Sequence, residues 1–123
     1  MAKTTKKDFE AFKAAFSYYQ DLFGLKDWRV CFEHGDAHQA YAEIFANCEG
    51  RIATVVFADK CDECGLVGYD PVNTGRHEAL ELLIAPLKDL ARKRTFSEDD
   101  LDASSHAVIR RLENLFDSIE EKK

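Results

Sequence analysis

The chain has 123 residues, which is the length of one domain, and 46% of them are apolar, so a hydrophobic core is expected. Lys and Arg total 17 against 23 Asp and Glu, and the resulting net charge of −6 disfavours duplex nucleic acid as a partner. The sequence has no run of about 18 apolar residues and no export signal at its start. We therefore predict a cytoplasmic protein without a membrane segment.

The first predicted element is a helix from about Thr5 to Phe23. Thr5 and Asp8 have the spacing of a capping box, with Asp in place of the usual Glu. Gly24 suits the position that follows a helix end. Aromatic residues recur at spacings of three and four, which predicts a buried face. These residues are Phe9, Phe12, Phe16, Tyr19 and Phe23.

The middle of the chain is predicted to form strands. Apolar and polar residues alternate over 28–33, which is typical of a strand with one buried face. Two apolar segments, 40–46 and 52–58, flank the turn-forming residues 47–50 and predict a hairpin. Residues 59–74 are rich in Gly, Pro and Asn, which predicts a long loop.

Two helices are predicted to close the chain. The first runs from about residue 74 or 75 to Leu90, and Pro86 is expected to kink or end it near Ala85. The second follows Ser97 and runs to about Ile119. Its buried stripe is predicted to contain Leu101, Val108, Leu112, Leu115 and Ile119. The predicted fold is a single α+β domain over residues 1–123, with an N-terminal helix, a small mostly antiparallel sheet and two C-terminal helices.

The most informative segment is RHEALELLIAPL, residues 76–87. His77 and Glu81 are four residues apart, so on a helix they lie on one face, with Glu78 beside the first. This pattern matches the His-Glu-x-x-His motif with its second His replaced by Glu. In that motif two ligands hold zinc and the intervening Glu activates a zinc-bound water. A carboxylate is also an accepted zinc ligand.

The order of three segments, GLKDWRV, RHEALELLIAPL and SSHAVIRRLENLF, resembles the small phage-encoded zincin-like metallopeptidases, relatives of the SprT-like group. The resemblance covers roughly residues 20–116. It implies a minimal zincin-like domain that hydrolyses peptide bonds with Zn²⁺. In this chain His77 matches the first metal ligand and Glu78 the general base. Glu81 stands where the family has its second His, giving His-Glu-x-x-Glu.

A third metal ligand is expected from the last helix. His106 is the first candidate and Glu113, seven residues later, is the alternative. Both lie at the flank of the predicted apolar stripe. Asp102 shares that face, and we expect it to orient His106 by accepting a hydrogen bond from the ring.

The four cysteines give a second hypothesis for a metal site. Cys61 and Cys64 form a C-x-x-C pair, which is half of a structural zinc site, and Cys31 and Cys48 are available to complete it. The other interpretation is that all four are small apolar thiols in a reducing compartment.

Two functions of different classes follow. The first is peptide-bond hydrolysis by zinc-activated water with Glu78 as general base, acting on a peptide or protein substrate. The alternative is a catalytically inactive, acidic zincin-like module that inhibits or adapts a host protein, in the cytoplasm of the host if a phage encodes it.

Overall fold

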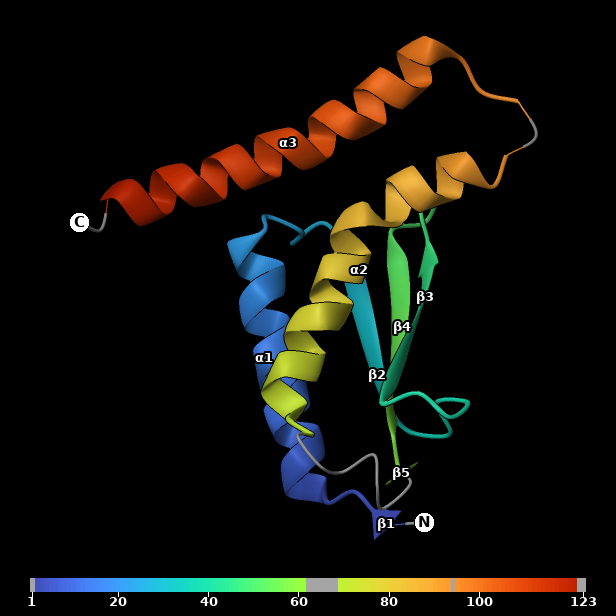
Figure 1. The fold of residues 1–123 in the computed structure, drawn as a ribbon, viewed down its shortest axis with the longest axis vertical. Helices are drawn as coiled ribbons and strands as arrows, with labels where there is room; N and C mark the ends of the chain where they lie inside the picture. The colour runs from blue at the N-terminus through green and yellow to red at the C-terminus, as the bar shows by residue number, and fades with distance from the viewer. Residues whose placement is uncertain (1, 62–68, 94, 122–123) are drawn as a thin grey trace.

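The computed structural model describes residues 2–61, 69–93 and 95–121. It confirms the predicted α+β fold, with one N-terminal helix, a small sheet and two C-terminal helices (Figure 1). In chain order the elements are β1 (Ala2–Lys3), α1 (Lys6–Leu22), β2 (Arg29–Gly35), β3 (Ala42–Asn47), β4 (Ile52–Ala58), β5 (Lys60–Cys61), α2 (Pro71–Ala91) and α3 (Glu98–Glu121).

Helix α1 begins and ends as its sequence predicts. The Thr5 side chain accepts a hydrogen bond from the Asp8 N–H at 3.0 Å, and the Asp8 carboxylate accepts one from the Thr5 N–H at 3.1 Å. Gly24, just after the helix, has a φ of +70°, which a residue without Cβ adopts readily. The predicted capping box is therefore confirmed.

The main sheet has the strand order β2-β4-β3. β3 and β4 form the predicted hairpin, in which Asn47 pairs with Ile52, and the Asn47 side chain accepts a hydrogen bond from the Gly50 N–H at 3.0 Å. β2 runs parallel to β4, with Arg29 opposite Ile52, and β1 pairs antiparallel with β5. Among the described residues, two of the three strand pairings are therefore antiparallel, as predicted.

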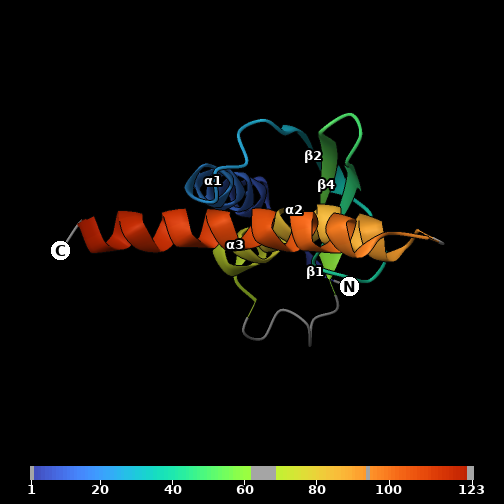
Figure 2. The same cartoon turned by 90° about the horizontal axis from the view of Figure 1, so that it is seen from above.

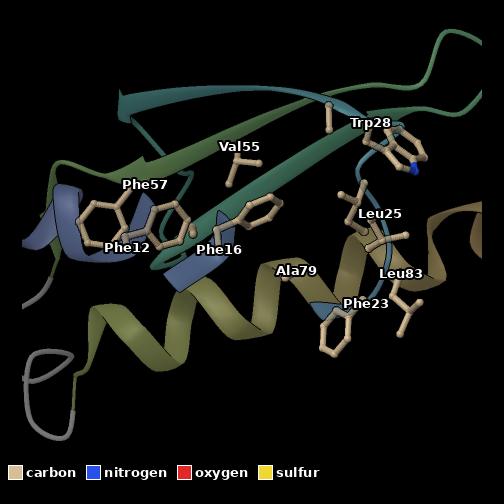
Figure 3. Close-up of a cluster of buried hydrophobic side chains, with 12 residues drawn as sticks. Phe12, Phe16, Phe23, Leu25, Trp28, Val55, Phe57, Ala79 and Leu83 are labelled. Carbon is tan, nitrogen blue, oxygen red and sulfur yellow. The ribbon is translucent and has the colours of Figure 1, made fainter. Parts of the chain in front are cut away.

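The hydrophobic core lies between one face of this sheet and two helices (Figure 3). Alternate residues of β4, Ala53, Val55 and Phe57, are completely buried and point to the same side. Phe12 and Phe16 of α1 meet them there, as the aromatic periodicity predicts. Helix α2 contributes Ala79, Leu82 and Leu83 to the same cluster.

Gly75 sets the distance between α1 and α2. A Cβ at this position would lie 2.7 Å from the Phe12 carbonyl oxygen and 3.0 Å from the Ala15 Cβ. A Cβ essentially never lies 2.7 Å from a backbone oxygen, so any other residue would force the two helices apart here. Gly75 lies inside α2, which begins at Pro71, so the predicted helix start at residue 74 or 75 is too late.

Helix α2 begins at Pro71. Asp70 caps it, and its carboxylate accepts a hydrogen bond from the Val72 N–H at 2.9 Å. Proline at the first helical position needs no hydrogen bond from its nitrogen, which explains the earlier start. The helix continues past Pro86 to Ala91, and its ribbon changes direction in this last part (Figure 1). Pro86 therefore bends the helix rather than ending it.

Helix α3 follows Ser97, whose hydroxyl accepts a hydrogen bond from the Asp100 N–H at 3.1 Å, so the predicted cap is confirmed. The predicted buried stripe is wrong, because none of residues 98–120 is buried. Val108, Leu112 and Leu115 pack only partly against the core, and the side chains at the two ends of the stripe are exposed. The reason is visible in both views: the C-terminal part of α3 extends past α1 (Figures 1 and 2), and its N-terminal end points away from α2 (Figure 1).

Among the described residues, no helix has both the length and the apolar character needed to cross a membrane.

Candidate functional site

Glu78 is the only charged side chain that is buried among the described residues, with 6% of its surface exposed. It lies on α2 one residue before Ala79, which belongs to the core. The pKa of its carboxyl is raised to about 7, mainly because burial removes its hydration; His77 opposes this rise and the nearby Glu81 carboxylate adds to it. A carboxyl group with such a pKa can both accept and release a proton near neutral pH.

His77 and Glu81 lie one helical turn apart and approach each other, as predicted. His77 Nε2 is 3.7 Å from Glu81 Oε1. The His77 side chain is 69% exposed and the Glu81 side chain is 29% exposed, so this pair lies at the surface next to the buried Glu78. The second oxygen of Glu81 accepts a hydrogen bond from the Lys88 ammonium group at 2.9 Å.

The spacing of this pair can be tested against a zinc ion. Two ligand atoms about 2.1 Å from a tetrahedral zinc ion lie roughly 3.4 Å apart. The observed 3.7 Å between His77 and Glu81 is close to this value, so the pair fits two positions of a zinc site. Across residues 2–61, 69–93 and 95–121, however, no three His, Cys, Asp or Glu side chains are grouped so that they could hold a metal ion.

The candidate third ligands therefore do not join the pair in this structure. The ring of His106 is exposed, and its Nδ1 donates a hydrogen bond to the backbone carbonyl of Asp102 at 2.7 Å. Asp102 therefore accepts a hydrogen bond from the ring, and the acceptor is its main-chain carbonyl. Glu113 is exposed on α3.

The three described cysteines lie at different places along the strands. Cys48 lies before the start of β4 and Cys61 after its end, and the seven residues of this strand separate them by about 20 Å. These two residues therefore do not share a metal site. Cys31 is exposed on β2, and Cys64 lies outside the described residues, so the role of the C-x-x-C pair stays a prediction.

Strand β3 borders the candidate site. Within the described residues it pairs only with β4, so its other edge carries no strand. A small hollow of about 60 Å³ separates this strand from α2. Ile44 and Ala46 line it on one side and Glu81, Lys88 and Arg92 on the other. A shallow groove between β3 and α2 therefore lies beside Glu81, one member of the pair.

Two polar residues near the site were not predicted. Lys88 lies seven residues after Glu81, and this spacing of two helical turns is a signal in the sequence that indicates contact. Glu43 of β3 forms a hydrogen bond with His38, with 2.7 Å between its Oε2 and the ring Nδ1. Its charge also contributes to the raised pKa of Glu78. Nothing in the sequence indicates that this strand lies beside α2.

Comparisons of the chain with protein-family models, curated proteins and solved structures gave no match.

Proposed function

We propose that the chain is a zincin-like, metal-dependent hydrolase of peptide bonds, with Glu78 as its general base. The observation that carries this proposal is the placement of Glu78, a buried carboxyl group that lies next to the His77–Glu81 pair and near the edge strand β3. Burial of a carboxyl group costs stability. A protein retains such a group when its chemistry is needed, as in the acid–base groups of active sites.

His77 and Glu81 would hold the metal, whose contribution is a bound water with a pKa near neutrality. With such a water bound, Glu78 would accept its proton and pass it to the leaving amine. Its buried position keeps the pKa of the carboxyl group at about 7, so it can accept and release a proton at the pH of the cell. The described residues supply only two ligands, so completion of the site requires a further donor or a movement of α3.

The substrate in this proposal is an extended peptide. An open strand edge offers unpaired backbone groups to a peptide, which then adds to the sheet as a further strand. Along β3 such a peptide would lie beside the groove that Ile44 and Glu81 border. A cytoplasmic location is part of the same proposal.

The test combines metal content and turnover. We expect about one zinc per chain by elemental analysis, lost in His77→Ala, and hydrolysis of an unfolded protein such as casein. Glu78→Gln should retain zinc and lower the rate of hydrolysis at least 100-fold, which is the usual contribution of a general base. His106→Ala tests whether His106 is the third ligand, since it should lower zinc affinity only if α3 closes onto the pair. A chain that binds no zinc at micromolar concentration would contradict the proposal.

Lys88 provides a test of Glu81 on the same helix. Its ammonium group occupies one oxygen of Glu81 and competes with a metal ion for that carboxylate. Lys88→Met should therefore tighten zinc binding if Glu81 is a ligand. Unchanged affinity in this variant would remove Glu81 from the ligand set.

The ion pair between Glu81 and Lys88 also favours the second candidate function, a binding module without catalysis. In that case Glu81 is satisfied by Lys88 and needs no metal. Glu78→Gln would then change neither zinc content nor any hydrolytic activity, and a protein partner would be the target of further experiments.

A further inference from the structure

The apolar residues of α3 are only partly covered. Val108, Leu112 and Leu115 face the body, but four large apolar side chains remain 39–58% exposed. They are Leu101, Ile109, Phe116 and Ile119, and we call them the apolar stripe of α3. The helix is about 36 Å long, and its C-terminal part extends past the body of the molecule (Figure 2). Exposed apolar surface of this kind marks interaction sites.

Acidic residues line the outer side of this stripe. Glu113 lies four residues after Ile109 and three before Phe116, so its exposed carboxylate lies between these two side chains on the same side of the helix. By the same spacing rule, Asp102 lies seven residues before Ile109 and Glu120 four after Phe116. Among the described residues, the three carboxylates form none of the salt bridges.

The charge of the whole protein is concentrated on this helix. α3 holds eight acidic and two basic residues, a net charge of −6, and the entire chain also carries −6. The rest of the molecule is therefore neutral. A second copy would bring its own α3, with the same negative charge, against the stripe, and nucleic acid would be repelled as well. The charge of α3 selects a basic partner.

We propose that the apolar stripe of α3 and its acidic border bind a basic amphipathic helix of another protein. Apolar side chains of that helix at positions i, i+3, i+4 and i+7 would cover Ile109 and Phe116, in the way that amphipathic helices bind apolar grooves. Its Lys or Arg residues would pair with Asp102, Glu113 and Glu120. This binding site is separate from Glu78, so it does not depend on the proposed hydrolase activity.

The probe is a fluorescein-labelled 18-residue peptide of Leu and Lys, with Leu at helical spacing, and fluorescence anisotropy measures its Kd. We expect binding that weakens at least tenfold between 50 and 300 mM NaCl. The double variant Ile109→Ser with Phe116→Ser should raise the Kd at least tenfold. Glu113→Lys with Glu120→Lys should do the same and also reduce the salt dependence, because these positions supply the opposing charge.

Two matched controls lie elsewhere on the surface. Tyr18→Ser removes a side chain on α1 that is 60% exposed, and Glu49→Lys reverses an exposed charge in the hairpin turn. Neither should change the Kd, and circular dichroism should show that all variants remain folded. A scrambled Leu/Lys peptide and a Leu/Glu helix should bind at least tenfold more weakly.

Three results would overturn the proposal. One is equal binding of the Leu/Lys and Leu/Glu helices, which would remove the role of charge. Another is a Kd that the α3 variants leave unchanged. The third is sedimentation equilibrium showing a dimer that Phe116→Ser dissociates, since the stripe would then be covered by a second copy.

Discussion

The two C-terminal helices carry the same kinds of local sequence signal and differ in environment. Both begin at a side-chain cap and both carry apolar residues at helical spacing. Helix α2 nevertheless buries six residues, among them Leu82 at 0% exposure, whereas none of residues 98–120 of α3 is buried. Periodicity indicates which side of a helix is apolar, and contacts distant in sequence decide what covers that side.

The difference follows from where the helices lie. α2 packs against α1 through Gly75 and against the sheet through Leu82, so two neighbours cover it. α3 crosses the end of this layer and reaches the core only through its middle residues (Figure 1). The free energy of unfolding should therefore depend strongly on the buried side chains of α2 and only weakly on the exposed side chains of α3.

The largest expected effect compares a leucine of α2 with an isoleucine of α3. Leu82→Ala leaves a cavity in a fully buried site and should lower the free energy of unfolding by about 3 kcal/mol. Ile109→Ala removes a side chain that is 49% exposed and should cost less than about 0.5 kcal/mol. Urea unfolding followed by circular dichroism measures both. Similar costs for the two variants would mean that the outer side of α3 is covered within this chain.

The next prediction tests the contact that holds α2 in place. In an exposed helix interior, Gly→Ala stabilises by about 1 kcal/mol. At Gly75 the added Cβ would lie 2.7 Å from a backbone oxygen, so Gly75→Ala should instead destabilise the protein by about 2 kcal/mol. Gly50→Ala is the control, since its Cβ would have no neighbour closer than 3.6 Å. Thermal unfolding of both variants distinguishes a clash from a general effect of losing glycine.

The third prediction concerns the buried carboxyl group of α2. Because the pKa of Glu78 is about 7 in the folded chain and near 4.5 in an unfolded one, the folded state binds its proton more tightly. Stability contributed by this group is therefore lost as the pH rises from about 4.5 to 7, and the cost is complete above that range.

Glu78→Gln should remove this dependence and raise the free energy of unfolding at pH 8 by about 2 kcal/mol. At pH 4 the two proteins should differ little. Glu113→Gln on α3, where the carboxylate is exposed, should leave the pH profile of the wild type unchanged. A profile for Glu78→Gln that parallels the wild type would show that this carboxyl group is hydrated and has an ordinary pKa.

Local signals in the sequence were sufficient for much of the fold. The Thr5 and Ser97 caps, the aromatic face of α1 and the hairpin turn after Asn47 each depend on a few neighbouring residues, and each is confirmed. The parallel pairing of β2 with β4 joins segments that another strand separates in sequence, so no local pattern indicates it.

The candidate site shows the same division. One helical turn brings His77 and Glu81 within 3.7 Å, which the spacing predicts. The position of His106 relative to them depends on how α3 crosses the body, and the apolar period of α3 does not specify that crossing. The burial of Glu78 likewise depends on the packing of α2 between α1 and the sheet, although its place in an apolar segment was an indication.

The smallest effect compares the caps of the two helices. Asp70→Ala and Ser97→Ala each remove one hydrogen bond to a helix N-terminus, a change that typically costs about 1 kcal/mol. Because α2 is part of the core, Asp70→Ala should lower global stability by that amount. The start of α3 is exposed and can unwind while the core remains folded, so Ser97→Ala should change global stability by less than about 0.5 kcal/mol. It should instead speed amide hydrogen exchange in the first turns of α3. If Ser97→Ala lowered global stability as much as Asp70→Ala, α3 would unfold together with the core, and the contrast between the two helices would not extend to their stability.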